Sequence, residues 1–421
     1  MKLLKNENVI KLMENVLNRV DPRLVDHGRR VAYLMFRILE PHNIFGDKLL
    51  HDICLLAMLH DIGAYKTEEI DKMVMFETNE VRQHSIYGYL FLKHFSPLKE
   101  LAPIILYHHA NCSEINHIDS TLHQFLSQLI SLCDRIDVFL LEHGLSDDFL
   151  SYIHENRKIK YSDHTVDILL ESQINLNSVF NDIDTDTRFN SFFYDMPMSG
   201  KDVDDFIKMI VASIDFRSHY TVIHTVSTTC IAGMLAKLLN MNKEDIENIK
   251  TGAMLHDIGK VAIPISIVEK DGKLSDMEMA IMKTHVYLTE KVLEGLVDDK
   301  IINIATRHHE KLDGSGYPEN NDSHNTTLAD RIVAVSDIFS ALCEPRSYKP
   351  AYPKEKVCEI LAEMSVKNLL DPRVVTASIK HYDKIMNAIE QESQQFLRAY
   401  KSINSQYDGI IKANVEQQNV A

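Results

Sequence analysis

A series of histidines and aspartates occurs twice in this chain of 421 residues, and it constrains the fold more than any other feature. Both copies keep one order, with matched intervals of 33 against 32, 24 against 29, 24 against 23, and 25 against 28 residues. The first copy is His27, His60, Asp61, His84, His108, His109 and Asp134, and the second is His224, His256, Asp257, His285, His308, His309 and Asp337. The flanks agree too, because Ala-Met-Leu-His-Asp-Ile-Gly stands at 57–63 and again at 253–259. The chain is therefore predicted to be a duplication.

The second copy continues into a loop that the first copy lacks. Residues 308–318 read His-His-Glu-Lys-Leu-Asp-Gly-Ser-Gly-Tyr-Pro and follow a predicted helix at 301–306. The loop contains too much Gly and Pro to be a helix or a central strand. Paired histidines before such a loop let imidazole nitrogens reach a metal, while the small residues leave room for a ligand.

The rest of the chain has helical periodicity and no sustained period-two alternation. Only 14 Gly and 11 Pro are present, so long helices with few turns are expected. In the first half, helices are predicted at 9–20, 24–39, 48–59, 84–94, 101–108 and 122–141. We predict an all-α fold of two tandem helical bundles, with domains at 1–177 and 201–394, a polar linker at 178–200 and a polar tail at 395–421.

Composition narrows the classes of function and compartment. A net charge of −16 argues against a DNA- or RNA-binding protein, and an anionic ligand would need bound cations or local Lys and Arg. The six cysteines show no CxxC spacing and are expected to be reduced thiols: Cys54, Cys112, Cys133, Cys230, Cys343 and Cys358. No apolar run reaches membrane-spanning length and the N-terminus is unlike a signal peptide, so a soluble, cytoplasmic protein without membrane contact is expected.

Each copy of the series has more ligands than one structural zinc requires. Imidazole with carboxylate suits Fe, Mn, Zn or Ni, whereas all-oxygen sets suit Mg or Ca. Adjacent His256 and Asp257 would project about 100° apart on a helix, which favours two ions over one. Two divalent ions can activate a water for phosphoryl displacement and supply the missing positive charge. The alternative is that these histidines only hydrogen-bond inside the helical bundles.

From about 220 to 351, the second half resembles the HD-GYP family of metal-dependent cyclic dinucleotide phosphodiesterases, in the HD phosphohydrolase superfamily. The resemblance rests on residues 256–264, 308–318 and 346–350. It implies that the second set of seven residues binds two transition metal ions, iron or manganese, with Asp257 as the bridging, catalytic ligand. It also implies that the substrate is bound by Lys260, which approaches the scissile phosphate, and by Gly314, Tyr317, Arg346 and Lys349.

Four positions depart from the family pattern without removing a ligand. Tyr220 replaces a Glu that serves a third metal in some members, which favours two ions. Ser227, Thr289 and Ser340 replace an Arg, a Gly and the second Asp of an Asp-x-x-Asp motif. Loss of such supporting residues can weaken metal affinity or turnover.

The first half resembles an HD domain without the loop. It keeps all seven candidate ligands but has Ala64 one turn after His60, where the second half has Lys260. Our hypothesis is that this half binds metal too. It would then regulate the second half or hydrolyse something smaller, such as the terminal phosphate of a linear product.

The resemblance implies hydrolysis of cyclic di-GMP, or of a mixed guanine–adenine cyclic dinucleotide, to its linear form by a metal-activated water. The alternative is a catalytically weak receptor in which ligand binding couples the two HD domains. A third interpretation, a scaffold protein, does not account for the duplicated ligand set. Two partner questions stay open: whether an amphipathic helix at 376–400 pairs two copies into a homodimer, and whether cyclic-dinucleotide synthases dock on the Tyr317 loop.

Overall fold

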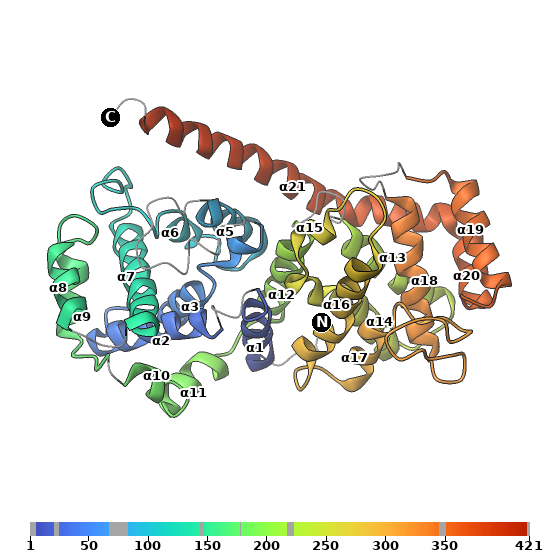
Figure 1. The fold of residues 1–421 in the computed structure, drawn as a ribbon, viewed down its shortest axis with the longest axis horizontal. Helices are drawn as coiled ribbons and strands as arrows, with labels where there is room; N and C mark the ends of the chain where they lie inside the picture. The colour runs from blue at the N-terminus through green and yellow to red at the C-terminus, as the bar shows by residue number, and fades with distance from the viewer. Residues whose placement is uncertain are drawn as a thin grey trace. The chain divides into compact units, whose positions relative to one another are not determined.

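The computed structural model describes residues 6–20, 25–66, 83–143, 147–176, 178–216, 223–344 and 351–418. Within these ranges every regular element is a helix, and β pairing is limited to isolated bridges at Arg157–Tyr161 and Asp313–Asp322. The predicted all-α class is therefore confirmed. The described residues form two compact units (Figure 1). The N-terminal unit contains 6–209 and 403–418, and the C-terminal unit contains 210–402.

The N-terminal unit is a bundle in which α2 packs on α3 and α7, and α5 packs on α6 and on the short helix η3. Its helices are α1 (Asn6–Leu17), α2 (His27–Leu39), η2 (Glu40–His42), α3 (Asp47–Met58), η3 (Ile62–Lys66), α5 (Gln83–Phe95), α6 (Ala102–Leu106), α7 (Thr121–His143), α8 (Asp147–Glu155), α9 (Asp163–Glu171), α10 (Val179–Asp182) and α11 (Thr187–Asp195). The segment 178–200, predicted as a linker, contains α10 and α11. Phe189 and Phe193 of α11 are fully buried, and α11 packs on α1 and α3.

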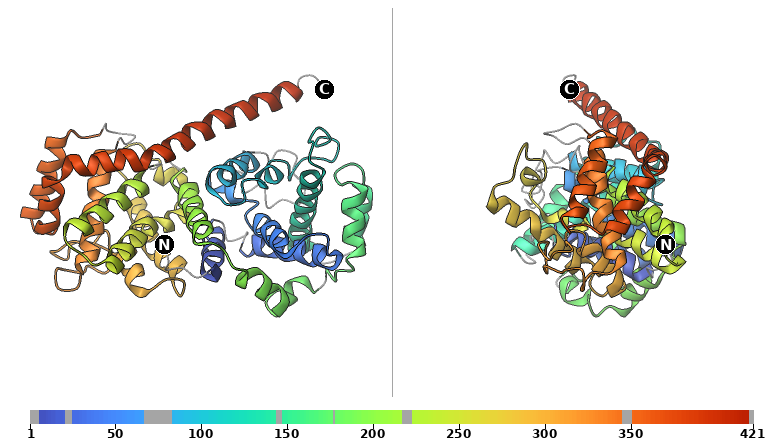
Figure 2. Two further views of the ribbon diagram at one scale, coloured as in Figure 1. Left: turned by 180° about the vertical axis from the view of Figure 1, so that it is seen from behind. Right: turned by 90° about the vertical axis from the view of Figure 1, so that its right-hand side faces the viewer.

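The C-terminal unit repeats the same order of helices. Its elements are α13 (His224–Leu238), α14 (Lys243–Leu255), η4 (Ile258–Ala262), α15 (Ile265–Val268), α16 (Asp276–Leu293), α17 (Asp299–Thr306), α18 (Leu328–Cys343), α19 (Lys354–Val366) and α20 (Pro372–Lys380). Helices α12 (Gly200–Asp215) and α21 (Tyr382–Gln418) contribute residues to both units. Helices α13, α14, α17, α18, α19, α20 and the start of α21 contribute side chains to one apolar core. Figure 2 shows the backbone from two further sides, with α13 light green and α20 orange-red.

Local sequence fixes where several of these helices begin. Ser275 and Glu278 form a reciprocal capping box at the start of α16, and Thr327 and Asp330 do the same for α18. Asn242 caps α14 by accepting a hydrogen bond from the backbone amide of Asp245. These caps set the register of the three helices that bear or precede second-copy histidines and Asp337.

The helices predicted at 24–39, 48–59, 84–94, 101–108 and 122–141 appear as α2, α3, α5, α6 and α7, with ends within three residues. The continuous helix predicted at 376–400 is wrong, because α20 ends at Lys380 and α21 begins at Tyr382. Helix α21 then runs through the predicted tail to Gln418. All six cysteines are unpaired. Of the helices in the described ranges, none combines the length and apolarity that crossing a membrane requires.

Candidate metal centres

The first histidine–aspartate series converges at one place in the N-terminal unit. His27 is the first residue of α2, while His60 and Asp61 lie in the turn between α3 and η3. His84 comes from α5, whereas His108 and His109 directly follow α6, and Asp134 lies within α7. Five segments thus bring seven side chains together, as the duplicated pattern predicted.

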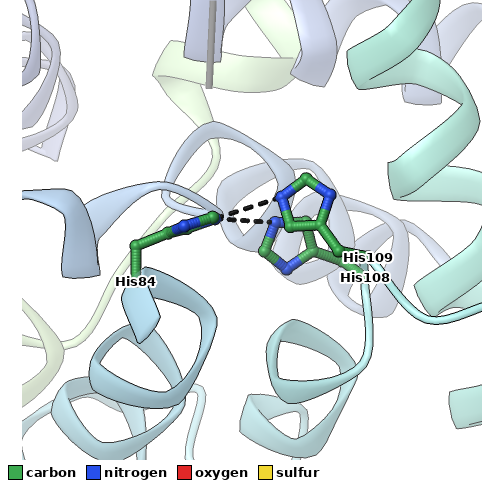
Figure 3. Close-up of side chains that lie close together, drawn as sticks. All are labelled: His84, His108 and His109. Carbon is green, nitrogen blue, oxygen red and sulfur yellow. Dashed lines mark hydrogen bonds between the residues drawn. The ribbon is translucent and has the colours of Figure 1, made fainter. Parts of the chain in front are cut away.

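The distances in this cluster are those of neighbouring ligands around shared ions. His84 Nε2 lies 3.4 Å from His108 Nε2 and 3.1 Å from His109 Nε2 (Figure 3). His27 Nε2 lies 3.3 Å from His60 Nε2. The two oxygens of Asp61 reach different histidines, Oδ1 at 3.4 Å from His84 and Oδ2 at 3.3 Å from His60. A carboxylate with this placement can bridge two metals.

The second series forms the same cluster in the C-terminal unit. Asp257 again divides its oxygens, with Oδ1 at 3.4 Å from His285 Nε2 and Oδ2 at 3.2 Å from His256 Nε2. His285 Nε2 lies 3.4 Å from His308 Nε2. Asp337 Oδ1 lies 3.0 Å from His224 Nε2, and Asp337 Oδ2 lies 3.8 Å from His309 Nδ1. The structure therefore brings together every ligand predicted for this half.

Backbone carbonyls determine which ring nitrogen faces the cluster. The Nδ1 atoms of His256, His285 and His308 donate to the carbonyls three residues earlier, at 2.7, 2.7 and 2.6 Å. His60 and His108 are held in the same way, at 2.7 and 2.6 Å. Since a carbonyl only accepts, Nδ1 carries the proton of each neutral ring and Nε2 presents a lone pair.

Facing lone pairs are the clearest sign that these residues suit a bound cation. His285 and His308 direct two Nε2 lone pairs at each other across 3.4 Å, an arrangement that repels unless a cation lies between them. In the described part of the chain, His256 Nε2 and Asp257 Oδ1 are buried and make no hydrogen bond. Such buried, unsatisfied acceptors are costly by themselves and suit metal coordination. The residues of both clusters therefore fit bound metal ions.

Burial and neighbouring charges shift the pKa values of the clustered residues in different directions. Burial lowers the pKa of His285 to about 4 and that of His309 to about 3. Burial also opposes charge on His224, but hydrogen bonds to Asp337 and Glu344 outweigh it and raise the pKa to about 10. Burial disfavours ionised Asp257, yet the charges of His256 and Lys260 hold the pKa of that carboxyl well below its usual range. His285 and His309 are thus held as neutral imidazoles and Asp257 as a carboxylate, the protonation states that metal ligands need, whereas His224 favours its protonated form beside Asp337 and Glu344.

A glycine after each His-Asp pair allows the close packing that the cluster needs. A Cβ atom at Gly63 would lie 1.9 Å from the carbonyl oxygen of His84, and one at Gly259 would lie 2.1 Å from that of His285. Only glycine fits at either position, so η3 and η4 can lie directly against the histidine-bearing helices α5 and α16.

The Glu310 side chain holds the glycine-rich loop of the C-terminal unit in place. This buried carboxylate accepts hydrogen bonds from the backbone amides of Glu319 and Asn321, at 2.8 and 2.9 Å. The Tyr317 ring lies 4.6 Å from the ring of His309, and Lys283 Nζ lies 4.8 Å from the centre of the Tyr317 ring. Tyr317 is thus placed beside the cluster, and its role in binding substrate stays a prediction.

Other residues predicted to bind substrate have mixed outcomes. Lys260 lies in η4 with Nζ 2.5 Å from Asp257 Oδ2, directly beside the cluster. Gly314 adopts a φ of +76° in the loop, so its evident role is the turn. Arg346 and Lys349 lie outside the described residues, as does Tyr220.

Two departures from the family pattern have partners in the structure. The Thr289 hydroxyl accepts a hydrogen bond from the Gly259 amide at 3.0 Å and donates one to the His256 carbonyl at 3.1 Å. Ser340 Oγ lies 3.1 Å from His224 Nδ1. Both side chains therefore support the segments that carry the ligands.

Sequence reasoning missed three residues that contact the predicted ligands and a fourth, Arg30, that binds one of those three. In the N-terminal unit, Asp137 accepts from His27 Nδ1, Arg30 binds Asp137, and Arg135 Nη2 donates to Asp134 at 2.7 Å. In the C-terminal unit, Glu344 Oε2 lies 3.5 Å from His224 Nδ1. The Asp-x-x-Asp spacing of Asp134 and Asp137 was the available signal for one of them.

Comparison with known proteins agrees with this architecture. Models of the HD domain match residues 24–138 and 207–374, and each range contains one complete ligand set. The 3'3'-cGAMP-specific phosphodiesterase 1 of Vibrio cholerae is 24% identical over 377 residues, which is 85% of this chain and 87% of that protein. A cyclic di-GMP phosphodiesterase response regulator of Xanthomonas campestris is 36% identical over 178 residues, 41% of this chain and 47% of that protein.

The fold also resembles a solved structure. A cyclic GMP-AMP-specific phosphodiesterase of Vibrio cholerae aligns with 91% of this chain and 97% of its own, with a TM-score of 0.56 and 18% sequence identity. This similarity concerns the fold of the two halves. The chain therefore contains two HD domains and is homologous to the HD-GYP phosphodiesterases of cyclic dinucleotides.

Proposed function

We propose that the C-terminal unit hydrolyses a phosphodiester bond of a cyclic dinucleotide, either cyclic di-GMP or a mixed guanine–adenine form, to give the linear product. The observation that carries the proposal is the pair of facing Nε2 lone pairs of His285 and His308, beside the divided carboxylate of Asp257. An arrangement of this kind is stable only with positive charge inside it. The names of the relatives from Vibrio and Xanthomonas supply the substrate class.

The proposed metal ligands are His224, His256, Asp257, His285, His308, His309 and Asp337. When bound, two divalent ions, iron or manganese by resemblance, would supply an activated water and stabilise charge on the reacting phosphate. Asp257, with one oxygen toward His256 and one toward His285, would hold the two ions at a fixed separation.

Lys260 and Tyr317 have the proposed roles of substrate contacts. The ammonium group of Lys260 pairs with Asp257, and the side chain is about one-fifth exposed, so it would turn toward a phosphate oxygen without leaving the site. The Tyr317 ring, beside His309, offers an aromatic face at the edge of the cluster. Thr289 and Ser340, whose substitution favoured a receptor without turnover, both hydrogen-bond within the frame of the site and so weigh toward an enzyme.

Hydrolysis by anaerobically purified protein tests this function. Cyclic di-GMP and the mixed dinucleotide would be incubated with added iron or manganese, comparing wild type with Asp257→Asn and Asp61→Asn. We expect Asp257→Asn to lower product formation by about 10³-fold, because metal-ion stabilisation of the transition state is worth several kcal/mol. A wild type that binds the dinucleotide tightly and forms no product would overturn the enzyme and favour the receptor.

For the N-terminal unit we propose a second metal site made by His27, His60, Asp61, His84, His108, His109 and Asp134. Its facing nitrogens and divided carboxylate match those of the other unit. If only Asp257→Asn abolishes product formation, this site would have a regulatory role or act in a later step on a smaller phosphate ester. Loss in both variants would mean that the two sites act together.

A further inference from the structure

In each cluster, the Nδ1 atom of the first histidine contacts residues that are not predicted ligands. These residues differ between the two units. In the N-terminal unit, His27 Nδ1 donates to Asp137 Oδ2 at 2.7 Å. Asp137 is fully buried, and Arg30 binds both of its oxygens, with Nε at 2.6 Å and Nη2 at 3.0 Å. This neutralised carboxylate fixes the ring so that Nε2 points toward His60 and Asp134.

The C-terminal unit has serines in place of both members of the Arg30–Asp137 pair. Ser227 follows the first histidine by three residues, as the arginine does, and Ser340 follows the last aspartate by three residues, as Asp137 does. Both serines are buried. The joint replacement makes physical sense, because an aspartate kept without its arginine would be a buried charge lacking its partner.

Glu344 brings a carboxylate to the same ring from another position. It lies one helical turn after Ser340, at the end of α18, and is 4% exposed. The Ser340 hydroxyl donates to Glu344 Oε1 at 2.8 Å and lies 3.1 Å from His224 Nδ1. Because a hydroxyl that donates to Glu344 can accept the Nδ1 proton, the three groups form a continuous hydrogen-bonded chain. Glu344 Oε2 also lies 3.5 Å from His224 Nδ1.

At the position that matches Glu344, the N-terminal unit has no carboxylate. Glu344 stands seven residues after Asp337, and the residue seven after Asp134 is Leu141. Leu141 is apolar and 52% exposed, so nothing at that position turns toward His27. The glutamate is therefore specific to the unit that has lost the aspartate and the arginine.

We propose that Glu344, acting through Ser340, is the residue that positions His224 for metal binding in the C-terminal unit. Its carboxylate holds the Nδ1 proton and so fixes the ring with Nε2 as the nitrogen turned toward the cluster, the task that Asp137 and Arg30 perform for His27. Residues that orient a ligating histidine in this way change metal affinity about 10–100-fold. The inference rests on the proposed role of His224 as a metal ligand.

Metal affinity of the full-length chain tests this role independently of turnover. The parent would be His60→Gln/Asp61→Asn, which disables the proposed N-terminal site so that bound metal reports on the C-terminal unit. Manganese stoichiometry and affinity would be measured by elemental analysis and by competition with a chromogenic chelator. Adding Glu344→Gln should weaken manganese binding about 10–100-fold. Adding Ser340→Asp and Ser227→Arg to Glu344→Gln, which rebuilds the pair of the other unit, should restore affinity.

Each outcome has a separate meaning. Equal manganese affinity of the parent and the Glu344→Gln variant would overturn the role of Glu344 while leaving the metal site intact. Weakened binding that the rebuilt pair does not restore, in protein with an unchanged melting temperature, would also overturn it. A parent that binds no manganese or iron would contradict the proposed ligands themselves, and with them the proposed function. The matched control is Leu141→Gln, which should leave manganese affinity unchanged.

Discussion

The two units share the inner frame of their clusters and differ in what surrounds it. In both, backbone carbonyls three residues back hold some of the histidines, and one aspartate divides its oxygens between two rings. The differences lie in the residues around the clustered histidines and aspartates. Lys260, the Tyr317 loop and the Ser340–Glu344 chain belong to the C-terminal unit, whereas Arg30, Asp137 and Arg135 belong to the N-terminal unit. The two units thus share the arrangement of the proposed metal ligands and differ in the residues around it.

The largest effect is expected where the units are identical. Gly259→Ala and Gly63→Ala would each place a Cβ atom about 2 Å from a backbone carbonyl, which the neighbouring helix can relieve only by moving. We expect each change to cost about 3 kcal/mol, the upper end for overpacking, and to lower the melting temperature by about 6–12 °C. Melting followed by circular dichroism would check this, with Gly46→Ala as control, since a Cβ at Gly46 meets nothing within 4 Å. If only one of the two alanine substitutions left the melting temperature unchanged, the packing around this glycine would differ between the units.

An intermediate loss of stability is expected at a pair of positions where the two units have different residues. Thr289 stands where the N-terminal unit has Gly88, and Ala305 stands where it has Ile105. A Cβ at Gly88 would lie 3.1 Å from Ile105 Cγ2, so the smaller Ala305 makes room for the threonine. Thr289→Gly should cost about 1–3 kcal/mol, because the Gly259 amide and the His256 carbonyl lose their partner.

The control for this exchange is Thr284→Gly, an exposed threonine on the same helix that reports the cost of glycine alone. Adding Ala305→Ile to Thr289→Gly, which recreates the N-terminal pair, should recover part of the stability by filling the space. Urea unfolding would measure all three variants. Equal losses for Thr289→Gly and Thr284→Gly would mean that the threonine hydroxyl contributes nothing.

The smallest effect concerns a group with no equivalent in the other unit. Burial raises the pKa of Glu14 in α1 from 4.5 to about 7, although a hydrogen bond from Tyr194 at 2.8 Å opposes the shift. Since the folded state binds this proton more tightly, its contribution to stability is complete below pH 4.5 and is lost as pH rises to about 7.

Glu14→Gln should therefore flatten the fall in melting temperature between pH 5 and 8 by a few degrees, at about 2–4 °C per kcal/mol. Thermal melting at four pH values would check this. The control is Glu7→Gln on the same helix, whose carboxylate is exposed and paired with Lys11. Identical pH profiles for wild type and Glu14→Gln would show that folding does not raise the pKa of Glu14.

Much of this protein was determined by the sequence alone. The order of ligands, the helix positions and the duplication all follow from patterns within a few residues or from one series compared with another. Helix ends such as Ser275 and Thr327 are encoded by the side chains that cap them. The break between α20 and α21 escaped prediction because apolar periodicity continues across His381.

Only the tertiary structure decided how each ligand is supported. That Thr289 bridges Gly259 and His256, or that Glu344 reaches His224 through Ser340, depends on side chains from separate helices meeting within about 3 Å. Spacing along the chain does not encode such contacts, because the same offset gives a buried Glu344 in one unit and an exposed Leu141 in the other. The clustering of the histidines and aspartates was thus predictable from the sequence, whereas their orientation and neighbours depend on how the helices pack.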